Sequence, residues 1–118
     1  MTKHFTDENF AKEVVEVSKT KPVLVDFFAE WCGPCKLQGS IIDQLADEMG
    51  EAAAIGKMNV EESSKTAEEY GVMTIPTLIV FKDGKSVANF TGLQNKDSLM
   101  TQIKKYLLFI GVFLYFAV

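Results

Sequence analysis

Two short apolar runs constrain the fold of this 118-residue chain more than any other feature. The run PVLVDFF occupies positions 22–28, and the run PTLIVF occupies positions 76–81. The first run carries apolar side chains on both faces of a strand, with Val23, Val25 and Phe27 on one face and Leu24 and Phe28 on the other. A strand that is apolar on both faces belongs in the middle of a sheet that helices cover on both sides.

Helical patterns alternate with these strands. An amphipathic segment over residues 6–19 begins with the cap-forming residues Thr6 and Asp7 and repeats apolar side chains at helical spacing. A longer helix is predicted from Pro34, because proline is well tolerated in the first turn of a helix. The predicted buried stripe of this helix consists of Ile41, Ile42, Leu45, Ala46 and Met49.

The second half of the chain continues the alternation. A second strand is expected within residues 53–60, and a short helix follows it. Ser63 or Ser64 can cap the start of that helix, and Gly71 can end it. A last helix is predicted to begin near Asn95. Its inward-facing side chains are Leu99, Ile103 and Leu107.

The last two strands form a predicted hairpin. Asp83-Gly84 is a strong signal for a tight two-residue turn, and it joins the strand at 76–81 to one at 86–91. The predicted order of elements is therefore α-β-α-β-α-β-β-α. This order is typical of an α/β fold with a central mixed β-sheet flanked by helices on both faces.

Composition restricts the classes of function. The net charge is −4 and no block of Lys or Arg stands out, which argues against nucleic acid as a partner, because phosphate binding needs a basic surface. The polar N-terminus MTKHFTDENF lacks the apolar segment of a secretion signal. The expected location is therefore cytoplasmic, where thiols are kept reduced.

Cys32 and Cys35 are the two cysteines of the chain, and Gly33 and Pro34 separate them. A structural disulfide would close a very short loop, and a chain with 47% hydrophobic residues does not need it. A structural zinc ion usually takes four Cys or His ligands, whereas the sequence adds to this pair only His4, which is expected at the surface. No metal is therefore expected, and a redox-active dithiol is the favoured alternative.

The residues around the pair suit thiol chemistry. Because the pair ends a strand and begins a helix, Cys32 should lie at a helix N-terminus, where free N–H groups and the helix dipole favour its thiolate. Cys35 lies one turn later and can attack a mixed disulfide formed at Cys32. Gly33 leaves room for a substrate chain, Pro34 fixes the first helical turn, and Trp31 supplies a flat apolar wall.

These residues also carry a family resemblance. VDFFAEWCGPCK at 25–36, with its WCGPC motif, and TIPT at 74–77 closely resemble the thioredoxin family. The resemblance extends from about Phe5 to Leu107. It implies a thioredoxin fold in residues 1–107 and the activity of a thiol–disulfide oxidoreductase.

The implied function is that of a protein-disulfide reductase in which Cys32 attacks the target disulfide and Cys35 resolves the mixed disulfide. The resemblance implies no bound cofactor apart from the redox-active Cys32–Cys35 disulfide. NADPH would act indirectly through a thioredoxin reductase, and the other partners would be protein disulfide substrates. A disulfide oxidant or isomerase on the same fold, and a redox-independent binding module, stay open as alternatives.

Asp26 interrupts the apolar strand between Leu24 and Phe28. Its apolar neighbours predict burial, and burial without a partner raises a carboxyl pKa toward the range useful for proton transfer. The resemblance places Asp26 under the dithiol, as the group that moves protons to and from Cys35. It also places Lys57 nearby, as a cation that tunes the acid. A solvated strand position is the plainer interpretation of that lysine.

The resemblance also implies a substrate site. It predicts a cis peptide bond between Ile75 and Pro76 that faces the dithiol, with the backbone of residue 75 pairing to the substrate in strand fashion. Thr74, Ile75 and Pro76 would form one wall of a substrate groove. Gly92 would form another part of it, where only a bare backbone fits.

Three features depart from the family pattern. Phe28 stands where Trp is frequent, and Gly39-Ser40 stands where many members have a helix-kinking proline, although a Gly/Ser pair can also bend a helix.

The third departure is the uncharged run LLFIGVFLYFAV, which continues past the usual end near Leu107. As a helix it would span about 18 Å, short of the roughly 30 Å bilayer core. Residues 108–118 are therefore an apolar tail of unknown role, with membrane contact, burial against a second copy and a non-native end as open alternatives.

Overall fold

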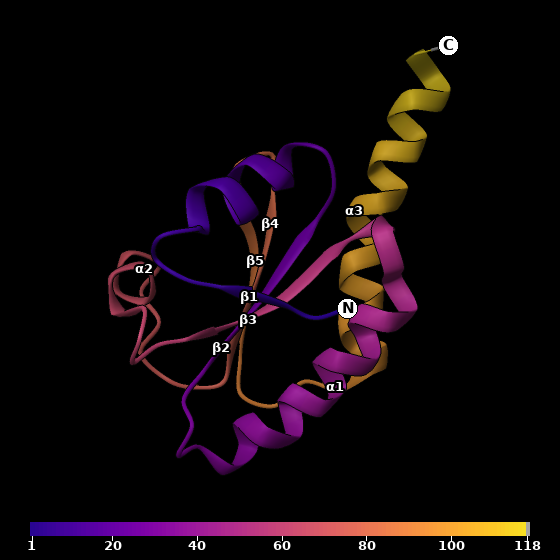
Figure 1. Ribbon diagram of the computed structural model, residues 1–118. Helices are drawn as coiled ribbons and strands as arrows, with labels where there is room; N and C mark the ends of the chain where they lie inside the picture. The colour runs from indigo at the N-terminus through magenta and orange to yellow at the C-terminus, as the bar shows by residue number, and fades with distance from the viewer. Residues whose placement is uncertain (118) are drawn as a thin grey trace.

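A computed structural model of the chain describes residues 1–117, and the side chains of residues 1–107. Within this part of the chain, five strands form one mixed sheet in the order β1-β3-β2-β4-β5 (Figure 1). The strands are β1 (Lys3–Phe5), β2 (Val23–Phe28), β3 (Ala54–Asn59), β4 (Thr77–Lys82) and β5 (Lys85–Thr91). β1, β3 and β2 run parallel, whereas β4 is antiparallel to β2 and β5 to β4. The predicted mixed sheet is confirmed.

Helical segments cover both faces of this sheet, as predicted. They are η1 (Ala11–Glu16), η2 (Val17–Lys19), α1 (Gly33–Met49), η3 (Gly50–Ala52), α2 (Ser64–Glu69) and α3 (Lys96–Ala117). η1, η2 and α2 lie on one side of the sheet, and α1 and α3 lie on the other (Figure 1). The long α1 begins directly at the cysteine pair, so the sheet and this helix together position the dithiol.

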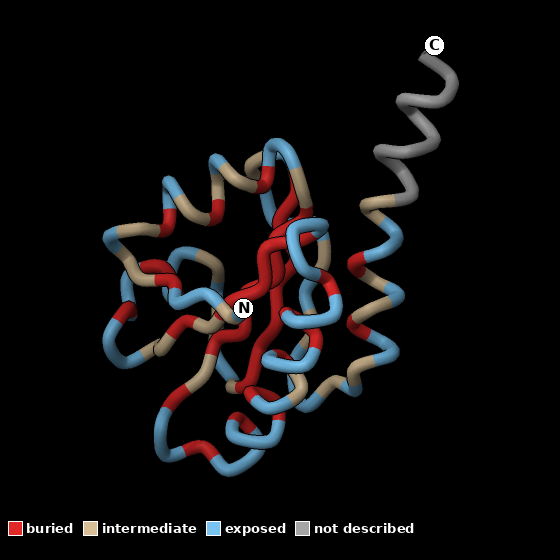
Figure 2. The backbone as a smooth tube through the Cα atoms, turned by 45° about the vertical axis from the view of Figure 1, so that its right-hand side comes forward, coloured by how far each residue is buried: buried red, intermediate tan, exposed pale blue. Residues whose placement is uncertain are grey.

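The central strand β2 is buried on both faces, as the apolar run predicts. Val23, Val25 and Phe27 belong to an apolar cluster with Phe10 and Val14 under η1. Leu24 belongs to a second cluster with side chains from α1 and α3, namely Ile42, Leu45, Leu99 and Ile103. Each such side chain stabilises the fold by about 1.5–3 kcal/mol. Figure 2 shows buried residues in the central strands of the molecule and exposed residues along the outward sides of the helices.

The chain begins with a strand that the sequence pattern did not predict. β1 pairs with β3 in parallel, with His4 opposite Lys57 and Lys3 opposite Gly56. A Cβ atom at Gly56 would collide with the ring of Phe5, so this glycine is needed for the close approach of β1. A three-residue strand carries too little alternation to be recognised, and the predicted order lacks it for that reason.

The helix caps differ from the prediction. Thr6 and Asn9 form two reciprocal hydrogen bonds before η1. The Thr6 N–H donates to Asn9 Oδ1 (2.8 Å), and the Asn9 N–H donates to Thr6 Oγ1 (3.2 Å). Asp7 instead caps α2, where its carboxylate accepts hydrogen bonds from the N–H groups of Thr66 (2.8 Å) and Lys65 (3.3 Å). A residue distant in sequence therefore takes the capping role that Ser63 or Ser64 was predicted to have.

The hairpin and the last helix follow the prediction. Asp83 and Gly84 have φ values of 56° and 82°, as a tight hairpin turn requires, and the turn joins β4 to β5. Asn95 caps α3 by accepting the N–H of Ser98 at 2.8 Å.

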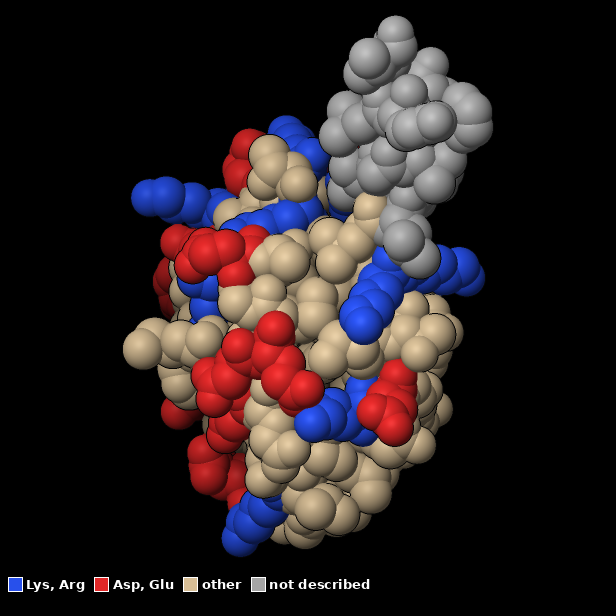
Figure 3. Space-filling model, turned by 90° about the vertical axis from the view of Figure 1, so that its right-hand side faces the viewer, with Lys and Arg blue, Asp and Glu red and all other residues tan. Residues whose placement is uncertain are grey.

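On the face of the molecule that α1 and α3 form, acidic and basic side chains are interspersed (Figure 3).

The backbone of α3 runs past Leu107 to Ala117 without interruption. The three alternatives for the tail at 108–118 concern side chains that lie outside the described residues. Among the residues that the structure does describe, none of the helices has both the length and the apolar character needed to cross a membrane.

Candidate active site

Cys32 and Cys35 form a disulfide at the N-terminus of α1, with their Cα atoms 5.2 Å apart. Cys32 is the N-cap residue with an extended backbone (φ −86°, ψ 112°), and its Sγ accepts the N–H of Cys35 at 3.2 Å. Pro34 lies in the first turn, as predicted. A sulfur that accepts a backbone N–H at a helix N-terminus is stabilised as a thiolate once the disulfide is reduced.

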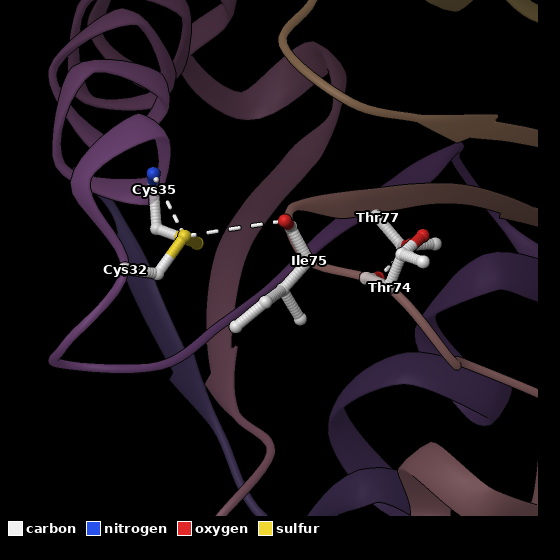
Figure 4. Close-up of a disulfide and its surroundings, with 5 residues drawn as sticks. All are labelled: Cys32, Cys35, Thr74, Ile75 and Thr77. Atoms are coloured by element: carbon white, nitrogen blue, oxygen red, sulfur yellow. Dashed lines mark hydrogen bonds between the residues drawn. A yellow bond between two sulfur atoms is a disulfide. The ribbon is translucent and has the colours of Figure 1, made fainter.

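The cis proline loop faces this disulfide. The Ile75–Pro76 peptide bond is cis, as predicted. The carbonyl oxygen of Ile75 points toward Cys32 and lies 4.0 Å from its Sγ (Figure 4). The hydroxyl of Thr77 donates to the carbonyl oxygen of Thr74 at 2.6 Å, which holds the turn before β4. Ile75 also packs against the buried cysteines.

The other predicted substrate residues are exposed near these elements. Trp31 is 71% exposed, and Gly33, Pro34 and Thr74 are also exposed. Gly92 has a φ of +82°, which L side chains rarely adopt, and its N–H donates to the carbonyl oxygen of Pro76 at 2.8 Å. The structure thus connects Gly92 to the cis proline through the backbone, while the substrate role of these residues stays a prediction.

Asp26 is fully buried in the middle of β2, as its apolar neighbours predicted. Neither carboxylate oxygen has a hydrogen-bond partner among the described residues. Burial raises the pKa of Asp26 from 3.8 to about 7, while the nearby Lys57 cation works in the opposite direction and the Asp43 carboxylate adds to the rise. A carboxyl with this pKa can accept and release a proton near neutral pH.

A cavity of about 440 Å³ lies between the sheet and α1. Both Cys35 and Asp26 line it, so the carboxyl and the second cysteine of the pair share one space. The further lining residues are His4, Phe28, Ala29, Glu30, Lys36, Gly39, Ser40, Asp43 and Lys57. A cavity of this size that is lined in part by carboxyl and ammonium groups can accommodate water, which can carry a proton between two groups that are not in direct contact.

Lys57 lies beside Asp26 on the neighbouring strand, in register with it. Its Nζ forms an ion pair with Asp43 Oδ1 at 3.1 Å, and the Thr2 hydroxyl donates to the same oxygen at 2.6 Å. The side chain of Lys57 is 20% exposed and is therefore partly shielded from solvent, while its role in tuning Asp26 stays a prediction. A Cβ at Gly39 would lie 3.2 Å from this Nζ, so the glycine leaves space for the ammonium group.

Sequence reasoning missed three residues near the dithiol. Asp43 was not recognised because it looks like one more exposed acid of a helix, and Thr2 because β1 was not predicted. Gln38 is fully buried one turn after Cys35 and bonds to the backbone of Gln94. A polar residue on the buried stripe of an amphipathic helix was the available signal for Gln38. His4 is exposed, as expected, yet β1 brings it to the rim of the cavity.

Comparisons with known proteins agree with this geometry. The thioredoxin family model matches residues 1–105. The chain is 45% identical over 105 residues to a thioredoxin of Rickettsia prowazekii, covering 89% of this chain and 98% of that protein. It is 47% identical over 106 residues to one of Chlamydia pneumoniae, covering 90% and 99%. A thioredoxin of Alicyclobacillus acidocaldarius is 39% identical over 102 residues, covering 86% and 94%.

Proposed function

This chain belongs to the thioredoxin family, and we propose that it is a protein-disulfide reductase of the cytoplasm. It is a thiol–disulfide oxidoreductase that works by dithiol–disulfide exchange at Cys32 and Cys35. The proposal adds the direction of electron flow, the role of each site residue, the partners and the compartment. One observation carries it above the others: a disulfide at a helix N-terminus shares a cavity with a buried Asp26 that has no hydrogen-bond partner within the described part of the chain.

Cys32 is the nucleophile of the proposed cycle. Its Sγ accepts a backbone N–H at the start of α1, which favours the thiolate. The thiolate attacks one sulfur of a target disulfide, so that a bond from Cys32 to the target forms and the target disulfide breaks. The second target sulfur leaves as a thiolate and takes a proton from solvent.

Cys35 then resolves the mixed disulfide. Its thiol gives a proton to the Asp26 carboxylate through the cavity that both residues line. The Cys35 thiolate attacks Cys32 Sγ, the bond between Cys32 and the target breaks, and the target leaves as a thiolate that is protonated in turn. Two electrons have passed to the target, and the Cys32–Cys35 disulfide is restored.

Lys57 and the exposed residues have supporting roles in this proposal. Lys57 places a positive charge beside Asp26 and limits the rise of the Asp26 pKa. The pKa of this carboxyl therefore stays close to neutral pH. The target chain pairs with the backbone at Ile75, next to the cis Pro76. The target also contacts the exposed residues around the disulfide, namely Trp31, Gly33, Pro34, Thr74 and Gly92.

The proposed partners complete the cycle. A thioredoxin reductase returns two electrons from NADPH to the Cys32–Cys35 disulfide, and a range of protein disulfides consumes them. The protein would thereby contribute to electron transport and redox homeostasis in the cytoplasm. The redox domain is proposed to comprise residues 1–107, and the apolar residues 108–118 are not needed for the exchange.

The reduction potential of the cysteine pair tests the proposed direction. The pair is equilibrated with a series of glutathione redox buffers, and free thiols are scored by alkylation. A potential at or below the cytosolic glutathione poise, about −220 to −320 mV, supports an electron donor. A potential near −180 to −120 mV would instead indicate a disulfide oxidant or isomerase and would overturn the proposal.

A pair of variants distinguishes the redox function from a binding role. Cys35→Ser should accumulate mixed disulfides with target proteins, because Cys32 can still attack while no second thiol resolves the product. Cys32→Ser should form none. If a variant lacking both thiols retained full cellular activity, the protein would act as a redox-independent binding module.

A further inference from the structure

Gln38 is a fully buried amide that the exchange chemistry described above does not use. It lies on the same face of α1 as Cys35, three residues further along the helix. Polar side chains are rarely buried unless their hydrogen bonds are satisfied. The partners of this amide therefore indicate what it does.

Both ends of the Gln38 amide bond to one residue of the segment between β5 and α3. Its Nε2 donates to the carbonyl oxygen of Gln94 at 3.0 Å, and its Oε1 accepts the N–H of Gln94 at 2.7 Å. The amide thus forms the same pair of hydrogen bonds with Gln94 that a neighbouring strand would form. Residues 92–95 are called the Gly92 loop here, and these bonds attach its backbone to α1. Removing the amide would leave a donor and an acceptor of that backbone without a protein partner.

The Gly92 loop is itself attached to the cis proline. The N–H of Gly92 donates to the carbonyl oxygen of Pro76 at 2.8 Å, and the carbonyl oxygen of the preceding Ile75 lies 4.0 Å from Cys32 Sγ. The disulfide joins Cys32 back to Cys35 and so to α1. A closed circuit of contacts therefore runs from α1 through Gln38, the Gly92 loop and the cis proline to the disulfide.

We propose that Gln38 is a positioning residue that fixes the Gly92 loop relative to the disulfide and thereby sets the affinity for extended protein disulfides. This inference rests on the proposed function, in which the target chain lies between the Gly92 loop, the cis proline and the disulfide. A small disulfide needs only access to Cys32, so its reduction depends little on the loop. A protein disulfide also contacts Ile75 and Gly92, so it depends on how they are held.

The test uses the variant Gln38→Met, which keeps the length of the side chain and removes both hydrogen bonds. Gln44→Met is the matched control, because Gln44 lies on the same helix and is exposed. Reduction of insulin is measured with dithiothreitol as the electron source. Reduction of a small aromatic disulfide is measured by mixing it with pre-reduced protein that has been freed of dithiothreitol. We expect KM for insulin to rise about threefold to tenfold in Gln38→Met with little change in kcat. The small disulfide should react within about twofold of wild type, and the control should match wild type on both substrates.

Equal losses on both substrates, or no change on either, would overturn the proposal. If wild type failed to reduce insulin at all, the proposed function itself would be wrong, which differs visibly from a loss confined to the variant. Amide hydrogen exchange at Gln94 in the wild-type protein gives a second measurement that needs no folded variant. Slow exchange of this N–H supports the contact with Gln38, and exchange at the rate of an unprotected peptide would contradict it.

Discussion

Strand β2 has two faces that are both largely buried and are chemically different. On one face, Val23, Val25 and Phe27 pack into an apolar cluster under η1 and α2. On the other face, Leu24 and Phe28 flank Asp26, whose carboxylate is fully buried and has no partner among the described residues. The first face stabilises the fold, whereas the second contains a group that weakens it when ionised. The same strand therefore supports the fold and places a proton acceptor at the candidate site.

The largest effect is expected on the apolar face. Phe27→Ala should lower the free energy of unfolding by about 3–5 kcal/mol, because it leaves a cavity where a buried ring contacts the core. Urea denaturation measures this change. Leu37→Ala is the control, since Leu37 is 55% exposed and its loss should cost little. A cost for Phe27→Ala no larger than that of the control would refute the assigned role of this face.

At Asp26, by contrast, substitution is expected to raise the free energy of unfolding at neutral and higher pH. Its pKa is 3.8 when exposed and about 7 in the folded protein, so the folded state binds more protons between these values. Stability should therefore fall as pH rises from about 4 to 7, by up to about 4 kcal/mol. Asp26→Asn should remove this slope and be more stable than wild type at pH 8.

Urea denaturation at several pH values measures that difference. Asp47→Asn is the matched control, because the Asp47 side chain is 80% exposed and should leave the slope in place. Parallel pH profiles for wild type and Asp26→Asn would show that the pKa of the buried carboxyl is not raised in the folded protein.

Two charges beside Asp26 should shift its pKa in opposite directions. Lys57→Met should raise the pKa of Asp26, because it removes a cation that favours the carboxylate. Asp43→Asn should lower it, because it removes a like charge and releases Lys57 from its ion pair. Carbon NMR titration of the Asp26 carboxyl measures both. Shifts in the same direction would mean that the two side chains act through packing and not through charge.

The smallest effect is expected at Gly39. Gly39→Ala should gain helix propensity but displace Lys57 Nζ, from which the new Cβ would lie 3.2 Å. Because that ammonium is the end of a flexible side chain, the net change in stability should be below about 1 kcal/mol. Thermal denaturation checks this. A loss of several kcal/mol would show that the position of Lys57 is rigidly held.

Local patterns were sufficient to predict most of the fold. Both faces of β2, the hairpin at Asp83-Gly84 and the start of α1 near Pro34 depend on residues close together in the sequence, and all three were found. β1 was missed because it is stabilised by pairing with β3 and by the absence of a side chain at Gly56. The cap of α2 was missed because Asp7 lies 59 residues before Thr66.

The candidate site was predictable to a similar extent. Cys32, Cys35 and the cis Pro76 follow from short motifs and the family resemblance, and the burial of Asp26 follows from its apolar strand neighbours. The pairing of Lys57 with Asp43 and the contact of Gln38 with Gln94 depend on helix and loop packing, which the spacing of residues does not encode. Sequence reasoning therefore could not predict contacts between residues that are distant in sequence and support the site indirectly.

The role of Asp26 as proton acceptor is tested most directly by following the two steps of one exchange separately. Reduced protein reacts with a chromogenic aromatic disulfide in a stopped-flow experiment. The first thiolate released reports attack by Cys32, and the second reports resolution by Cys35. At pH 7, Asp26→Asn should slow the second release by about 100-fold and leave the first within about threefold of wild type, because only the second step uses Asp26 as proton acceptor. Equal second-step rates in the two proteins would show that Asp26 does not accept the proton of Cys35.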